Sequence, residues 1–236
     1  MLNGKKVIIF DMDGTLIDSV GIWNQVDTAL IRQISTVPNP CTENVQAQRD
    51  RVLCQFSTSA SPYMEYCAYL RDTYRSALSA DEIHTLRYQI AQEYLVGTID
   101  YKKDADTFIR KLKSAGYTLV IATTTKKSNM EIYRTKNLNI INKANLDDYF
   151  SLIYTREDAR EIKPNPEIYL RVMRELGVSA KECLVFEDSL IGIEAAKRAG
   201  IESVAVYDIY SDADREAIHA LADYRIDSYT ELLECV

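Results

Sequence analysis

Short apolar runs recur along the chain and predict buried strands. The first is Lys6–Phe10 (KVIIF), which is rich in β-branched residues and ends abruptly at Asp11. Such a short run, bounded by polar residues, is typical of a strand that is buried on both faces. Similar runs follow at 119–122 (LVIA), 184–186 (LVF) and 204–207 (VAVY), with a weaker one at 152–154.

Between these runs the apolar residues follow the period of a helix. In residues 101–115 they stand at 101, 105, 108, 109, 112 and 115, and Gly116 follows. This stripe predicts an amphipathic helix from Tyr101, and the glycine predicts its end. Another helix is expected to open at Asn165-Pro166 and to end at Gly177. Strands that alternate with helices predict an α/β fold with a doubly wound parallel sheet.

Residues 20–97 break this alternation, because they contain helical stripes and no strand-like run. One stripe covers 22–34, and Ser79 with Glu82 forms a capping box for a later helix. We therefore expect an inserted helical module after the first strand. The expected boundaries are 1–18 with 98–236 for the core and 19–97 for the insert.

Length and composition fit an ordinary globular protein. The 236 residues are 47% hydrophobic and 27% charged, which is enough to bury a core. The apolar runs are too short to span a membrane, and Val7–Phe10 is too short for a signal peptide, so we expect the protein in the cytoplasm. Five cysteines without a CxxC pair predict neither a disulfide framework nor a structural zinc.

The net charge is −7, from 28 basic and 35 acidic residues. A chain with this balance lacks the basic surface of a nucleic-acid binder. It also repels phosphorylated small molecules unless a local cation or a bound metal reverses the field.

Polar side chains stand directly after three of the predicted strands, where open α/β sheets bind their ligands. These side chains are Asp11 and Asp13 (DMDGT), Thr123, Thr124 and Thr125, and Glu187 and Asp188. Lys163 stands in a loop just before the helix that opens at Asn165-Pro166.

Four carboxylates on one rim repel one another and raise one another's pKa. A hard divalent cation removes that cost, and carboxylate and carbonyl oxygens suit Mg²⁺. The metal would then recruit a phosphate, and hydroxyls such as those of Thr123 and Thr124, with Lys163, would complete a cradle for its oxygens. Residues i and i+2 of a strand point the same way, so Asp11 could attack phosphorus while Asp13 moves a proton to the leaving group.

The sequence resembles the haloacid dehalogenase superfamily in four segments, which stand in the family's order and cover the predicted core. They are VIIFDMDGTLIDS, LVIATTT, IKPNPEIYL and LVFEDSLIGIEAAKRAG. The insert looks like the four-helix type of cap domain in that family. The subgroup with an EDS motif contains sugar-phosphate and phosphoglycolate phosphatases and also β-phosphoglucomutases.

This resemblance implies a role for each matching residue. Asp11 would be the nucleophile and Asp13 the general acid/base. Thr123 would bind the transferring phosphoryl group, and Lys163 would steady its charge. Mg²⁺ would be bound by Asp188, by Asp11, by the backbone carbonyl of Asp13 and by Glu187, the last as a ligand or as a partner behind the ligands.

Departures from the family pattern narrow the choice among its branches. Trp23 stands where the mutase branch usually has a histidine, which makes a mutase less favoured. No lysine occurs between Asp18 and Ile99, which argues against the phosphonatase branch and its cap lysine. Asp13 is the second aspartate that the dehalogenase branch lacks.

We therefore predict a Mg²⁺-dependent phosphatase that hydrolyses a small, sugar-phosphate-like phosphomonoester through an aspartyl-phosphate. Its partner would be a small phosphorylated metabolite, with no nucleic acid or membrane, and nothing in the sequence demands more than a monomer. Two alternatives stay open. One is a β-phosphoglucomutase-like phosphomutase, and the other is a phospho-accepting signalling module, although receiver domains of that class are about half this length.

Overall fold

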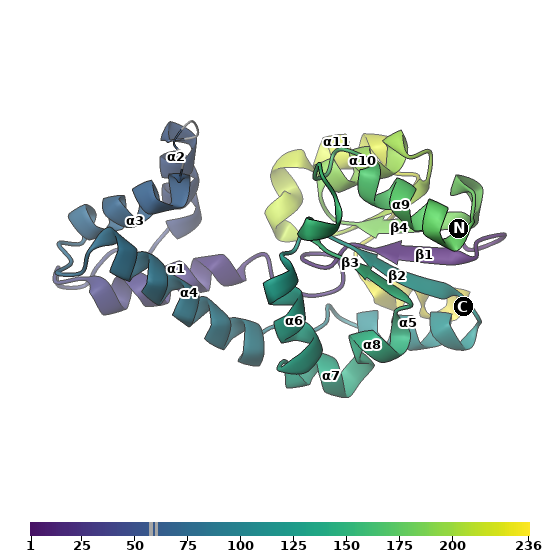
Figure 1. Cartoon of the computed structure of the whole chain (residues 1–236), viewed down its shortest axis with the longest axis horizontal. Coiled ribbons are helices and arrows are strands. Elements are labelled where there is room, and N and C mark those ends of the chain that lie inside the picture. The colour runs from purple at the N-terminus through teal and green to yellow at the C-terminus, as the bar shows by residue number, and fades with distance from the viewer. Residues whose placement is uncertain (57–58, 60) are drawn as a thin grey trace. The chain divides into compact units, whose positions relative to one another are not determined.

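The computed structural model describes residues 1–56, 59 and 61–236, and it divides into two compact units (Figure 1). The first, here called the α/β unit, comprises Met1–Val20 and Ile99–Val236. The second, here called the helical unit, comprises Gly21–Thr98. The chain thus leaves the α/β unit after Val20, shortly after its first strand, and returns to it at Ile99.

Within the described residues, six strands form one sheet in the α/β unit in the order β3-β2-β1-β4-β5-β6, and each neighbouring pair is parallel. The strands are β1 (Val7–Phe10), β2 (Thr118–Ala122), β3 (Leu152–Tyr154), β4 (Cys183–Glu187), β5 (Glu202–Val206) and β6 (Tyr224–Ile226). The chain builds outward from β1 in one direction and then in the other, so the predicted doubly wound sheet is confirmed.

Strand β1 lies at the centre of the sheet, and all four of its residues are buried. Phe10 at its end is in register with Ile121 of β2 and with Phe186 of β4. Because the three strands are parallel, the residues that follow them emerge at one edge of the sheet. Asp11 therefore emerges between Thr123 and Glu187.

Helices cover both faces of the sheet (Figure 1). Those of the α/β unit are α5 (Ala105–Ser114), α6 (Lys127–Thr135), α7 (Leu138–Ala144), α8 (Leu146–Tyr149), α9 (Glu167–Leu176), α10 (Leu190–Arg198) and α11 (Arg215–Leu221). Short 3₁₀ segments are η1 (Arg156–Asp158), η2 (Ala180–Glu182), η3 (Ile209–Asp214) and η4 (Tyr229–Cys235). Ile9 and Val185 pack toward α9 and α10, whereas Phe10 and Phe186 pack against Phe108 of α5 on the opposite face.

The predicted helix from Tyr101 is wrong at its beginning, since α5 starts at Ala105. Tyr101 instead forms an antiparallel bridge with Ile17, and its hydroxyl donates to the Ala144 carbonyl at 2.6 Å. Asp104 has a φ of 63°, which interrupts a right-handed helix before Ala105. This apolar residue at helical spacing is therefore buried within the α/β unit, beside a bridge to Ile17, and not on a helix.

The helical unit contains α1 (Ile22–Ile34), α2 (Val45–Gln55), α3 (Pro62–Thr73) and α4 (Ala80–Gly97). The predicted capping box of Ser79 and Glu82 begins α4. The unit also buries an ion pair, in which Arg87 donates to Asp27 at 2.6 Å. The guanidinium of Arg87 lies 4.7 Å from the ring centre of half-buried Trp23, so this tryptophan is held within the helical unit by a cation–π contact.

Within the described part of the chain, no helix is both long enough and apolar enough to cross a membrane.

Candidate active site

The loop after β1 carries the first two candidate residues. Asp11 is only 6% exposed, and its amide donates to the Phe186 carbonyl at 3.0 Å, which extends the sheet pairing by one residue. Gly14 then turns the chain with a φ of 81°. A Cβ atom at this position would lie 2.4 Å from Oδ2 of Asp188, so both the turn and the close approach require glycine.

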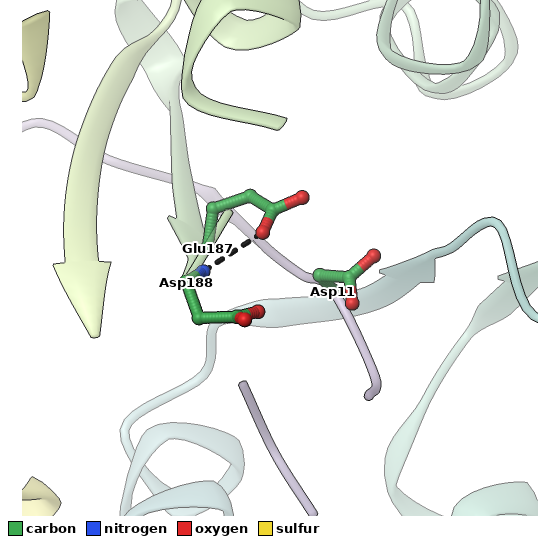
Figure 2. Close-up of side chains that lie close together, drawn as sticks. All are labelled: Asp11, Glu187 and Asp188. Atoms are coloured by element: carbon green, nitrogen blue, oxygen red, sulfur yellow. Dashed lines mark hydrogen bonds between the residues drawn. The ribbon is translucent and has the colours of Figure 1, made fainter. Parts of the chain in front are cut away.

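Three buried carboxylates meet at this edge of the sheet. Each of Asp11, Glu187 and Asp188 offers a carboxylate oxygen within 4.8 Å of the others. Figure 2 shows Glu187 and Asp188 extending from the end of β4 toward Asp11 at the end of β1. The structure therefore brings together the three carboxylates that the sequence analysis assigns to a metal, the fourth residue, Asp13, being assigned there through its backbone carbonyl.

Lys163 reaches the same cluster from the loop before α9 and is 3% exposed. Its ammonium group donates to Oδ1 of Asp11 at 2.6 Å and to Oε1 of Glu187 at 2.9 Å. It also lies 5.2 Å from the ring centre of Tyr169 in α9. A lysine in this position can stabilise negative charge on or beside Asp11.

The electrostatics of the cluster show a shortage of positive charge. Burial raises the pKa of Asp11 to about 7, although Lys163 opposes the rise. Burial and then the charges of Glu187 and Asp11 raise the pKa of Asp188 well above its ordinary value. Burial alone would lower the pKa of Lys163, but the two carboxylates beside it raise it well above its usual value. One ammonium does not balance three carboxylates, and a divalent cation with oxygen ligands fits this donor set.

The two oxygens of Glu187 are already engaged by donors. Oε1 accepts from Lys163, and Oε2 accepts from the amides of Asp188 at 2.8 Å and Ser189 at 3.1 Å and from the Ser189 hydroxyl at 3.2 Å. Gly192 of α10 lies directly against this side chain, because a Cβ there would stand 1.6 Å from Oε1. These hydrogen bonds therefore hold the Glu187 side chain in one position between Lys163 and the start of α10.

Asp13, the proposed acid/base, is half-buried and is surrounded by hydroxyl groups. Oδ1 accepts from the Ser19 hydroxyl at 2.5 Å and from the Tyr133 hydroxyl at 3.4 Å. Oδ2 accepts from the Thr125 hydroxyl. These bonds hold the carboxylate in one orientation while leaving it partly open to solvent.

The three threonines after β2 have different surroundings. Thr123 is 1% exposed, and its hydroxyl shares a hydrogen bond of 2.9 Å with that of Thr125, which is also buried. Thr124 between them is exposed. The structure therefore brings Thr123 into the hydrogen-bonded group of Asp13, but not Thr124, which the sequence analysis also assigned to phosphate.

Sequence reasoning missed several residues that support the site. Thr15, Ser19 and Thr125 stand within or beside the quoted motifs, so their hydroxyl groups were a usable signal. Tyr133 in α6 and Tyr229 in η4 come from segments without any local motif, and only the fold brings them here.

The fold and site define a doubly wound α/β protein with an acidic, lysine-containing centre at the carboxyl ends of its strands. The sequence model of one family, described as haloacid dehalogenase-like hydrolase, matches residues 5–200. The chain belongs to this family of hydrolases, as the resemblance of its motifs predicted.

Individual relatives agree with that assignment. The chain is 28% identical over 199 residues to the phosphorylated carbohydrates phosphatase of Thermotoga maritima, a match that covers 84% of this chain and 83% of that protein. A stretch of 61 residues is 56% identical to a Bacillus subtilis protein provisionally named phosphatase YhcW, but it covers only 26% of this chain and 28% of that protein.

Solved structures share the fold. A crystal structure of a Thermotoga maritima protein, provisionally described as a β-phosphoglucomutase, has a TM-score of 0.77 and 24% identity. The match covers 98% of this chain and 97% of that chain. At this identity, the likeness establishes the fold and not the reaction.

Proposed function

We propose that the protein is a Mg²⁺-dependent phosphatase that hydrolyses a small, sugar-phosphate-like phosphomonoester through an aspartyl-phosphate on Asp11. The observation that carries the proposal is the environment of Asp11. It is a buried carboxylate at the end of β1, bonded to Lys163 at 2.6 Å and clustered with Asp188. The named activity of the Thermotoga maritima relative supports a phosphorylated carbohydrate as the substrate class.

The carboxylates of Asp11 and Asp188 and the backbone carbonyl of Asp13 would hold Mg²⁺. Glu187 would act from behind these ligands, because its Oε2 already accepts three hydrogen bonds and its Oε1 accepts from the ammonium group of Lys163. When bound, Mg²⁺ would balance the charge of the carboxylates and of the substrate phosphate. The same charge would keep Asp11 ionised near neutral pH, because without it burial, partly offset by Lys163, raises the pKa of Asp11 to about 7.

In the first half of the reaction, an oxygen of Asp11 attacks phosphorus and the bond from phosphorus to the substrate oxygen breaks. Asp13 gives its proton to that leaving oxygen, which departs as an alcohol. Lys163 and the hydroxyl of Thr123 stabilise the phosphoryl oxygens while the charge shifts. The hydroxyl groups of Ser19 and Thr125 hold Asp13 in place for this transfer.

In the second half, a water molecule attacks the phosphorus of the aspartyl-phosphate. Asp13, now a carboxylate, accepts a proton from that water. The bond from phosphorus to Asp11 breaks, so inorganic phosphate leaves and the carboxylate of Asp11 is restored. We further propose that residues 1–18 with 98–236 form the catalytic core and that 19–97 form a cap domain that selects the substrate.

Phosphate release from a panel of sugar phosphates, phosphoglycolate and nucleotides tests this function. Each substrate is assayed in Mg²⁺ or in EDTA, with wild-type protein beside Asp11→Asn. Release that requires both Mg²⁺ and Asp11 is the expected result. Undiminished turnover by Asp11→Asn contradicts the mechanism. Isomerised sugar phosphate without released phosphate would instead identify a mutase, and stable phosphorylation without turnover a phospho-accepting module.

A further inference from the structure

The segment that follows the family match, residues 201–236, also contacts the proposed metal site. The family match ends at residue 200, but the chain continues through β5, η3, α11, β6 and η4. Two side chains from this segment lie beside the carboxylate cluster. They are Tyr229 of η4 and Ser211 of η3.

Tyr229 is connected to the cluster through Thr15. The Tyr229 side chain is 1% exposed, and its hydroxyl donates to the Thr15 carbonyl at 3.2 Å inside the protein. The hydroxyl of Thr15, also buried, donates to Oδ1 of Asp188 at 2.7 Å. A chain of two hydrogen bonds thus joins the C-terminal segment to a carboxylate that we propose binds Mg²⁺.

The ring of Tyr229 is fixed in the core. It stacks on Phe186 with ring centres 5.9 Å apart and contacts Phe108 at 5.5 Å. The η4 segment begins with a capping box between Ser228 and Glu231, and Lys111 of α5 donates to the Leu233 carbonyl. Burial, with Asp188 nearby, raises the pKa of the Tyr229 hydroxyl well above its ordinary value, so it remains a donor at neutral pH.

Ser211 approaches the other oxygen of the same carboxylate. Its hydroxyl lies 3.4 Å from Oδ2 of Asp188. The turn that carries Ser211 is held by Asp208, whose carboxylate accepts from the Tyr210 amide at 2.9 Å and from Lys102 at 2.7 Å. The two oxygens of Asp188 are therefore each approached by a hydroxyl; the segment after residue 200 supplies Ser211 itself and, in Tyr229, a donor to the backbone of Thr15.

We propose that Tyr229, through Thr15, and Ser211 are positioning residues that orient the carboxylate of Asp188 for a divalent cation. This inference rests on the proposed function, because it concerns the same metal site. Groups that orient metal ligands typically change metal affinity by 10- to 100-fold when they are removed. The loss of the Tyr229 hydroxyl also leaves the buried Thr15 carbonyl without this donor, which allows the loop to shift.

The test is binding of MgCl₂ and, separately, MnCl₂ to EDTA-treated, dialysed full-length protein, measured by calorimetry. Tyr229→Phe keeps the ring and removes only the hydroxyl, and we expect it to bind Mg²⁺ about tenfold more weakly than wild type. Tyr224→Phe, on the edge strand β6 of the same segment, is the matched control and should bind within about twofold of wild type. Thermal unfolding in EDTA checks that each variant folds, so that a loss of affinity is not a loss of structure.

Affinity of Tyr229→Phe within twofold of wild type overturns the proposal. If that variant fails to fold, Ser211→Ala is tested in its place, because Ser211 lies outside the core. Weaker Mg²⁺ binding by Ser211→Ala supports the proposal, and unchanged binding overturns it. Phosphate release is measured on the same preparations. If wild-type protein binds Mg²⁺ but releases no phosphate, the proposed phosphatase activity is wrong. The positioning role of Tyr229 and Ser211 is then judged from the binding measurements alone. Wild-type protein that binds neither cation overturns both.

Discussion

Gly192→Ala gives a sharp prediction because helix propensity and the local geometry oppose each other. Residue 192 lies in the first turn of α10, where alanine would ordinarily favour the helix by up to about 1 kcal/mol. The added Cβ, however, would stand 1.6 Å from Oε1 and 1.9 Å from Cδ of Glu187. The Glu187 side chain must therefore leave its position.

The cost follows from the bonds that Glu187 makes there. Displacement breaks its bond to Lys163, at 2.9 Å, and its bonds to the amides of Asp188 and Ser189. Hydrogen bonds to a charged group contribute about 1.5–3 kcal/mol each, so losing even two of these three outweighs the gain in helix propensity by about 2–5 kcal/mol. Lys163 also loses one of its two carboxylate partners, so we expect phosphate release to fall together with stability.

Urea denaturation and phosphate release would both be measured for this variant. Gly97→Ala is the matched control, because Gly97 ends helix α4 and a Cβ there would meet nothing within 4 Å. The control should be neutral or slightly more stable than wild type. A Gly192→Ala protein with wild-type stability and activity would refute the argument that Glu187 is locked between Lys163 and α10.

Three further predictions concern the same centre. Lys163→Met breaks a buried ion pair and should lower the free energy of unfolding, measured by urea denaturation, by about 3–5 kcal/mol. A loss below about 1 kcal/mol would contradict the conclusion that Lys163 is buried and paired with carboxylates. Stabilisation by Mg²⁺ should be larger at pH 8 than at pH 5.5. Because the folded pKa of Asp11 is raised to about 7, above its unfolded value of about 3.9, the metal-free protein loses stability as pH rises through that range, and Mg²⁺ binds the deprotonated form. If Mg²⁺ raises the unfolding temperature equally at the two pH values, this prediction is wrong. Tyr169→Phe should stay within about 1 kcal/mol of wild-type stability, because no described residue makes a well-formed hydrogen bond to its buried hydroxyl, although Lys163 lies beside it; a clear loss would show that the contact with Lys163 stabilises the protein.

The sheet was predictable because its strands carry their own signal. Strands β1 and β4 are short, apolar and bounded by polar residues, so their burial could be read locally. Parallel strands share an edge, so the meeting of Asp11 with Glu187 and Asp188 followed from where the runs end. The resemblance of the motifs to the haloacid dehalogenase superfamily then predicted the class of hydrolase, which the family match confirms.

Other features depend on contacts that no local pattern carries. Helix α2 is largely polar, and β6 has only three residues at the edge of the sheet, so neither gives a recognisable apolar pattern in the sequence. The bond between Tyr229 and Thr15 joins residues 214 positions apart. Tyr101 matches the helical spacing but lies in a bridge with Ile17, and these two residues, far apart in the sequence, meet only in the folded α/β unit.

The central claim is that Asp11 carries the phosphoryl group, and acid quenching tests it most directly. Asp13→Asn protein, in which breakdown of the intermediate should be slow, is mixed with the preferred substrate and Mg²⁺, quenched in acid, digested and analysed by mass spectrometry. The account predicts one phosphoryl group on the peptide that contains Asp11, and none on the same peptide from protein that also carries Asp11→Asn. A phosphoryl group on any other residue, or phosphate release that persists without Asp11, would contradict it.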